Sequence, residues 1–130
     1  MDVNFPVQIE PFAEKHYIKK FSRKYKSHWD VTLTAIKAEL ERIDALLKTD
    51  RAILISENLG VKIVKTKFRV SGTKESAKTS GNRCIVAWHQ EKKTVSILLV
   101  YNKTDLSSHN ETAEWQNVIK NNYPEYKKFF

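Results

Sequence analysis

Apolar residues recur at helical spacing through the first half of the chain. Between Pro11 and Lys26 every fourth position is apolar, as in an amphipathic helix, and many of the others are lysine or arginine. The apolar positions of this segment are Ala13, Tyr17, Phe21 and Tyr25. From Asp30 the apolar spacing alternates between three and four, at Leu33, Ile36, Leu40, Ile43 and Leu47. The pattern predicts two consecutive helices that pack as a hairpin, the second capped by Ser27 or Asp30.

Gly60 marks a change from a helical period to alternation with a period of two. Between Val61 and Val70 the even positions suit a core, whereas the odd positions Lys65, Lys67 and Arg69 project from the other face. The even positions are Val64, Thr66, Phe68 and Val70. This segment is therefore predicted to be a half-buried strand with a cationic outer face.

Two further strands are expected after this one. The segments Arg83 to Gln90 and Thr94 to Tyr101 are joined by a polar hairpin turn at residues 91–93. The second segment is apolar on both faces, which is typical of a central strand. A weaker strand is expected between Val3 and Glu10, where Phe5, Val7 and Ile9 alternate.

The chain is expected to end in a helix. Ser108 and Glu111 have the spacing of a capping box, and an apolar stripe follows until the helix ends near Pro124. The stripe consists of Trp115, Val118 and Ile119. The predicted order is β-α-α-β-β-β-α, an α+β fold with the helical hairpin packed on a sheet. No repeat or linker divides it, so residues 1–130 are expected to form one domain.

Positive charge is concentrated in the second half of the chain. The protein has 130 residues and a formal charge of +8; residues 1–60 have ten lysines and arginines against nine acids, whereas residues 61–130 have thirteen against six. Between Lys62 and Arg83 there are seven cations and one acid, Glu75. Such a local field favours a polyanionic partner, RNA above all, although a solvated basic face is the alternative.

Several other functional classes lack their sequence patterns. No apolar run reaches the ~18 residues needed to span a membrane, and the start is unlike a signal peptide, so a cytoplasmic protein is expected. Cys84 is the only cysteine and is expected to be a buried apolar residue. The four histidines lack zinc-site spacing, and the three glycines form no phosphate-binding loop. Neither a metal nor a cofactor is expected.

The remaining candidates are basic residues and a tyrosine on the predicted strands or just past their ends. They are Lys65, Lys67, Arg69, Arg83, Tyr101 and Lys103. Antiparallel pairing of the strands can bring them together. An Arg fork and mobile ammonium groups suit a phosphoryl transition state, and clustered lysines lower one another's pKa, as general-base work requires. Since RNA carries its own nucleophile, the 2′-hydroxyl, such a cluster can cleave it without metal.

Three stretches carry a resemblance to a known family: "KTKFRVSG", "KTSGNRCIVAW" and "LLVYNKTDL". They resemble the RelE/HigB-like toxins of bacterial type II toxin-antitoxin systems, best over residues 61–106. The resemblance implies a helical hairpin on a small twisted antiparallel sheet. It also implies an endoribonuclease that cleaves mRNA on the ribosome without metal, and a cognate antitoxin as partner.

The resemblance also implies roles for individual residues. Arg83 would stabilise transition-state charge, Lys103 would contact the leaving group or phosphate, and Lys65 or Lys67 would act as base or phosphate ligand. Tyr101 would stack or orient the substrate, together with the substrate-binding residues Arg69, Lys74 and Lys78. Some members close the site with a Tyr or His after the last strand. Here His109, Tyr123 and Tyr126 are available, and none is assigned.

Alternatives remain open at the level of residues and of function. Tyr101 can be a half-buried core residue, and Arg83 can pair with an acid. A noncatalytic RNA-binding module would use the same basic patch, with Trp88, Tyr101 or Trp115 as stacking surfaces. A toxin of the same fold directed against DNA gyrase is a further alternative.

Overall fold

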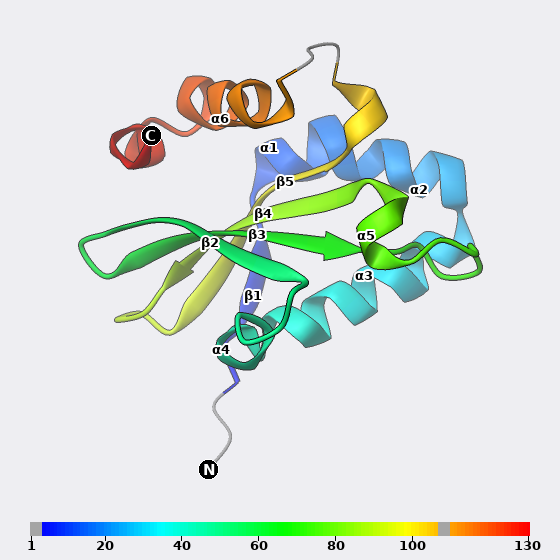
Figure 1. Ribbon diagram of the computed structural model, residues 1–130, viewed down its shortest axis with the longest axis horizontal. Coiled ribbons are helices and arrows are strands. Elements are labelled where there is room, and N and C mark those ends of the chain that lie inside the picture. Colours follow the sequence, from blue (N-terminus) through cyan, green and yellow to red (C-terminus); the bar gives the residue numbers. More distant parts are fainter. Residues whose placement is uncertain (1–3, 107–109) are drawn as a thin grey trace.

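The computed structural model describes residues 4–106 and 110–130, shown in Figure 1. Within these ranges five strands form one sheet in the order β1-β5-β4-β3-β2. The strands are β1 (Val7–Ile9), β2 (Ala52–Asn58), β3 (Val61–Phe68), β4 (Asn82–His89) and β5 (Thr94–Asn102). The α-helices are α1 (Pro11–Ala13), α2 (Lys19–Tyr25), α3 (Ser27–Leu40), α4 (Ile43–Leu46), α5 (Ala77–Ser80) and α6 (Glu111–Asn122). Three other helical turns are η1 (Glu14–Ile18), η2 (Lys103–Asp105) and η3 (Pro124–Phe129). The predicted α+β class is confirmed.

The first predicted helix is present as the consecutive segments α1, η1 and α2. Its middle part, η1, is a π-helix. This wider winding shifts the side chains that follow it around the helix axis. Ile18 and Phe21 are buried in the core, whereas Tyr17 and Tyr25, which a regular helix would place on the same stripe as Phe21, are half-buried.

The second predicted helix is divided into α3 and α4. Helix α3 begins at Ser27, and its N-cap is Lys26, which has a φ of 52° and provides no side-chain cap. The predicted cap by Ser27 or Asp30 is therefore wrong, because the sharp turn at Lys26 starts the helix earlier than the apolar pattern does. Three buried residues maintain the apolar spacing across the break: Leu40, Ile43 and Leu46.

The sheet is mixed, not wholly antiparallel. Strands β2 to β5 pair antiparallel with their neighbours, whereas β1 runs parallel to β5, with Val7 opposite Val95 and Ile9 opposite Ile97. Alternation in a three-residue strand predicts which side is buried but contains no information about direction. The predicted antiparallel arrangement is therefore correct for four strands and wrong for β1.

The predicted order lacks strand β2 and the short helix α5, and with them it becomes β-α-α-β-β-α-β-β-α. The apolar residues of β2 do not alternate, and Ile53 and Leu54 are 46% and 45% exposed. The pairing with β3 also shifts between Leu54 and Ser56. Because β2 lies at the edge of the sheet and includes this irregularity, it lacks the period of two by which a half-buried strand is predicted.

Helices cover both faces of the sheet (Figure 1). Helices α2 and α3 pack on one face through a cluster that includes Phe21, Trp29 and Phe68. Helix α6 and η3 pack on the other face through a second cluster that includes Trp115 and Ile119. Strands β4 and β5 are buried along almost their whole length, as expected of central strands. The face of β3 predicted to be open to solvent is therefore partly covered by α6.

Candidate functional site: a basic cluster around Glu111

Strand register brings the predicted basic residues together on the face covered by α6. Lys67 of β3 lies opposite Arg83 of β4, which lies opposite Tyr101 of β5. Lys65 is two residues from Lys67 and therefore shares its face of the strand. Lys103 follows directly after β5. Antiparallel pairing thus brings Lys67, Arg83 and Tyr101 together as expected, whereas Arg69, which was expected with them, lies past the end of β3.

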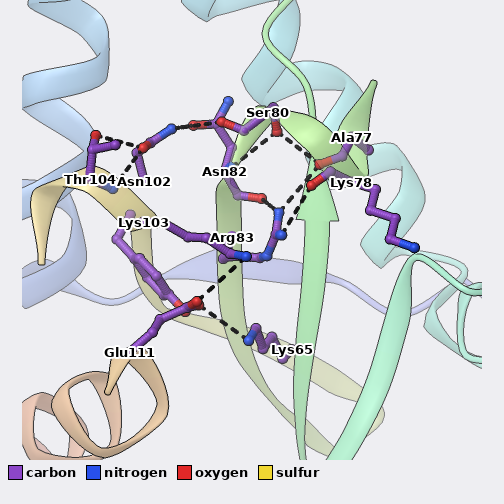
Figure 2. Close-up of polar contacts among 11 residues, drawn as sticks. Lys65, Ala77, Lys78, Ser80, Asn82, Arg83, Asn102, Lys103, Thr104 and Glu111 are labelled. Carbon is purple, nitrogen blue, oxygen red and sulfur yellow. Dashed lines mark hydrogen bonds and ion pairs between the residues drawn. The ribbon is translucent and has the colours of Figure 1, made fainter. Parts of the chain in front are cut away.

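A carboxylate lies among these residues (Figure 2). The Lys65 Nζ is 3.2 Å from Glu111 Oε2, and the Lys103 Nζ is 3.8 Å from Glu111 Oε1. Tyr101 donates its hydroxyl hydrogen to Glu111 Oε2 over 2.6 Å. We call Lys65, Tyr101, Lys103 and Glu111 the Glu111 cluster. The sequence identified Glu111 only as a partner in a capping box, because its distance in sequence from β3 hides the contact with Lys65.

Helix α6 holds Glu111 at this position. Its N-cap is Asn110, whose side chain accepts a hydrogen bond from the Ala113 backbone N–H over 3.1 Å. Trp115 and Ile119, one and two turns along, are fully buried against the sheet. The cap is Asn110, and Ser108 of the predicted capping box lies outside the described residues.

The cluster fixes the charge states of its tyrosine and its acid. Burial raises the pKa of Tyr101, and the hydrogen bond to Glu111 raises it further, so the phenol stays neutral and donates. Burial alone would raise the pKa of Glu111. The hydrogen bond from Tyr101 and the two ammonium groups outweigh it and lower that pKa below its ordinary value. Glu111 is therefore a carboxylate throughout the neutral range.

Arg83 is buried beside this cluster, with 3% of its surface exposed. Its Nη1 donates to the carbonyl oxygens of Asn82 and Ala77, over 2.9 and 3.3 Å, and its Nη2 donates to that of Lys78 over 3.2 Å. Two of these carbonyls belong to α5, so the guanidinium anchors that helix. Among the described residues Arg83 Nε has no hydrogen-bond partner.

Side-chain amides join the α5 turn to the end of β5. Asn102 Nδ2 donates to Ser80 O and to Asn82 Oδ1, over 3.0 and 2.7 Å. The Lys103 backbone N–H donates to the carbonyl of Gly81 over 2.9 Å. Gly81 has a φ of 78°, which a side chain would disfavour. These contacts fix Arg83 and Lys103 relative to each other. Asn82 lies in a stretch that carries the family resemblance, but no role was expected for either asparagine.

The other predicted substrate-binding residues lie outside the Glu111 cluster. Arg69, Lys74 and Lys78 are exposed, and the Lys78 side chain points away from Glu111 in Figure 2. Arg69 lies just past the end of β3 and lines a groove of about 520 Å³ that α3 also lines. Strand β3 ends at Phe68, not at Val70 as predicted, so Arg69 does not continue the row of Lys65 and Lys67.

The aromatic residues considered for stacking or for closing the site are engaged elsewhere. Trp88, Tyr101 and Trp115 are buried, and so offer no free ring face to a base. Tyr123 donates to the Leu98 carbonyl over 2.7 Å, and the Tyr126 hydroxyl is 2.8 Å from His89 Nε2. His109 lies outside the described residues. Within residues 4–106 and 110–130 there is also no group of three or more potential metal ligands.

Comparison with solved structures identifies the architecture. The chain superposes on one from the crystal structure of the archaeal RelE-RelB complex from Pyrococcus horikoshii OT3, with a TM-score of 0.53 and 14% identity. The match covers 76% of this chain and 94% of that one. The fold is RelE-like. At this identity the similarity extends to the fold and does not distinguish a HigB-like type.

Comparisons by sequence add no closer relative. No protein-family model matches the chain, and no curated protein matches it. In the described part of the RelE-like fold no helix is both long and apolar enough to cross a membrane.

Proposed function

We propose that this protein is the toxin of a type II toxin-antitoxin system and cleaves mRNA with the ribosome, without a metal ion. One observation carries the proposal: strand register on a RelE-like fold brings Lys65, Lys67 and Arg83 to one face, beside Lys103. A group of cations held on rigid strands is suited to stabilise the extra charge of a phosphorane. An mRNA substrate further implies a cytoplasmic site of action.

In the proposed reaction RNA supplies its own nucleophile. Lys67, as the neutral amine, accepts the 2′-hydroxyl proton and O2′ attacks the adjacent phosphorus, while the Lys65 ammonium group, which is paired with Glu111 before substrate binds, contacts the phosphate. The bond from phosphorus to O5′ breaks as Lys103 donates a proton to O5′. The products are a 2′,3′-cyclic phosphate and a 5′-hydroxyl. Tyr101 is neutral and buried, so its proposed part is to donate its hydroxyl hydrogen to an anionic oxygen at the cluster rather than to stack on a base.

Arg83 is buried and contributes its positive charge to the site from below the protein surface. Three of the four hydrogens on its terminal nitrogens are donated to carbonyl groups, so among the described residues the Nε hydrogen, one Nη2 hydrogen and the delocalised positive charge remain for a substrate. A buried guanidinium acts over a longer range than an exposed one because water screens it less. We therefore propose that Arg83 stabilises transition-state charge through its field and through Nε.

The exposed cations provide the wider RNA surface. Arg69, Lys74 and Lys78 lie at the end of β3 and around α5, outside the Glu111 cluster. Contacts from such residues to backbone phosphates supply affinity without base specificity. Their proposed role is to hold mRNA or ribosomal RNA while the scissile phosphate lies at the cluster.

A cognate antitoxin is the proposed protein partner. The similar solved structure is described as a RelE-RelB complex. Among the described residues no strand pairs with the outer edge of β2, and the exposed apolar residues Val31, Ile53 and Leu54 lie on α3 and β2. Unpaired strand edges and apolar patches favour binding of an extended or amphipathic segment. The groove beside α3 is therefore the proposed antitoxin surface.

Induced expression in a bacterial host tests the function. Wild-type protein is expected to stop growth and to produce new transcript ends that primer extension maps. The substitutions Lys65→Ala, Arg83→Ala and Lys103→Ala are expected to reduce cleavage at least tenfold, because each removes a cation from the site. Lys48→Ala is the matched control: it removes an exposed lysine between α4 and β2 and is expected to cleave like wild type.

The alternatives predict different results in the same experiment. A noncatalytic RNA-binding module would leave transcripts intact, and its predicted stacking residues Trp88, Tyr101 and Trp115 are buried in this structure. A gyrase-directed toxin would stop growth with DNA damage and intact messages. Intact messages in arrested cells would therefore reject the nuclease proposal.

A further inference from the structure

Glu111 engages the donors that an RNA phosphate would need. The Lys65 Nζ lies 3.2 Å and the Lys103 Nζ 3.8 Å from its carboxylate oxygens. The Tyr101 hydroxyl donates to Oε2 over 2.6 Å. Like a phosphodiester, a carboxylate bears one negative charge on two acceptor oxygens. With Glu111 in place, the two ammonium groups are already paired before any substrate arrives.

A second observation indicates an anion site at this place. Arg83 is almost fully buried, yet its Nε has no hydrogen-bond partner in the described part of the chain. Buried donors in folded proteins are nearly always paired. Arg83 lies opposite Tyr101 in the strand register, and its positive charge counteracts the rise in the Tyr101 pKa. An unpaired cationic donor is thus buried next to the residue that binds Glu111.

The carboxylate can leave without unfolding the helix. Trp115 and Ile119 fix α6 on the sheet, while the Glu111 side chain remains 22% exposed at the first turn. Rotation about its side-chain bonds is enough to carry the carboxylate into solvent. Such rotamer changes in partly exposed residues are fast and require no movement of the fold.

We propose that Glu111 is an internal competitor for the anion site, and that a backbone phosphate of RNA displaces its carboxylate from Lys65, Tyr101 and Lys103. The inference rests on the proposed function for the identity of the ligand as RNA. A tethered carboxylate competes at an effective concentration on the order of millimolar or above. Single phosphate ions therefore bind poorly, whereas RNA gains further contacts with Lys74 and Lys78. Glu111 therefore weakens the binding of both ligands by the same factor, and RNA still binds because of its further contacts.

The substitution Glu111→Gln tests this proposal, because glutamine has nearly the same shape and no charge. Glu75→Gln is the matched control: it removes an exposed acid from the same basic surface, away from the Glu111 cluster. Two probes are titrated into each full-length protein: inorganic phosphate, and an RNA oligonucleotide that 2′-O-methyl groups protect from cleavage. Glu111→Gln is expected to bind both about tenfold more tightly than wild type, and Glu75→Gln less than about twofold.

Cleavage of an unmodified RNA by the same proteins separates the outcomes. Tighter binding with cleavage retained or increased supports the proposal. Unchanged or weaker binding by Glu111→Gln overturns it, even if wild type cleaves RNA. Tighter binding with cleavage lost also overturns it, because Glu111 would then be a proton acceptor in the reaction. If wild type never cleaves RNA but Glu111→Gln binds more tightly, the nuclease proposal fails and the competitor proposal stands.

Discussion

At the scale of single residues, the contact between Tyr101 and Glu111 determines how the site is charged. The phenol is buried and the carboxylate is partly exposed, so one hydrogen bond joins the core of the sheet to its surface. A hydrogen bond from a neutral donor to a carboxylate favours the charged form of the acid. The same contact therefore stabilises the folded protein and holds negative charge between two lysines.

Glu111 is expected to make folding stability depend on pH in the acidic range. Its pKa is lowered in the folded protein, so its contribution is complete above the ordinary value of 4.5 and is lost as the pH falls through the folded pKa. The free energy of unfolding of wild type should exceed that of Glu111→Gln by less than about 1 kcal/mol at pH 6. Urea unfolding between pH 3 and 6 should show the difference shrinking with acidity; a difference that grows instead would contradict the assignment.

Cys84 is expected to be inert in the folded protein. Burial raises the pKa of its thiol to about 12, which the hydrogen bond with Thr66 only partly offsets. Because the thiolate is the reactive form, iodoacetamide at pH 8 should label the native protein very slowly and the urea-unfolded protein readily. Native labelling at the rate of a free cysteine would show that this strand is open to solvent.

At the scale of elements, the four-residue helix α5 depends on contacts from outside itself. A capping box between Ser76 and Thr79 begins it, Gly81 ends it, and the Arg83 guanidinium holds two of its carbonyl groups. A helix this short has little stability of its own. The position of this turn, which precedes β4, therefore depends on Arg83.

Arg83→Ala is accordingly expected to destabilise the protein as well as to impair cleavage. Loss of three hydrogen bonds from a buried cation should lower the free energy of unfolding by about 2 kcal/mol or more. Arg83→Lys should give an intermediate loss, since an ammonium group cannot span the same carbonyls. In urea unfolding the control Arg69→Ala, at an exposed position, should stay within about 0.5 kcal/mol of wild type. Equal stability of Arg83→Ala and wild type would assign the guanidinium to substrate alone.

The elements that could be predicted are those with at least one consistently apolar side. The helical hairpin, β3, β4 and β5 have clear periods because one side, or both, is consistently apolar. Strand β2 was missed because edge exposure of Ile53 and Leu54 removes its alternation. The direction of β1 depends on its partner β5, far along the chain, and no local pattern contains that information.

At the scale of the whole molecule, the site forms where the sheet meets α6. Pairing of three strands places Lys67, Arg83 and Tyr101 in one row. Alternation and antiparallel order indicated that these residues could meet, but they did not give the register. The arrival of Glu111 from α6 was not predictable, because it depends on how the last helix packs over β3. The packing of the last helix over the sheet also buries Arg83 and Tyr101. The cationic face of β3 was expected to lie open to solvent.

Chemical analysis of the RNA products tests the central claim most directly. Purified wild-type protein is incubated with ribosomes programmed with an mRNA. In a parallel reaction without ribosomes, the protein is incubated with the same mRNA in buffer containing a chelator. The new RNA ends are then characterised. The account predicts fragments with 2′,3′-cyclic phosphate and 5′-hydroxyl ends, and no cleavage at a site where the upstream nucleotide has a 2′-deoxy sugar. Cleavage that persists at the 2′-deoxy site, or intact mRNA, would contradict it.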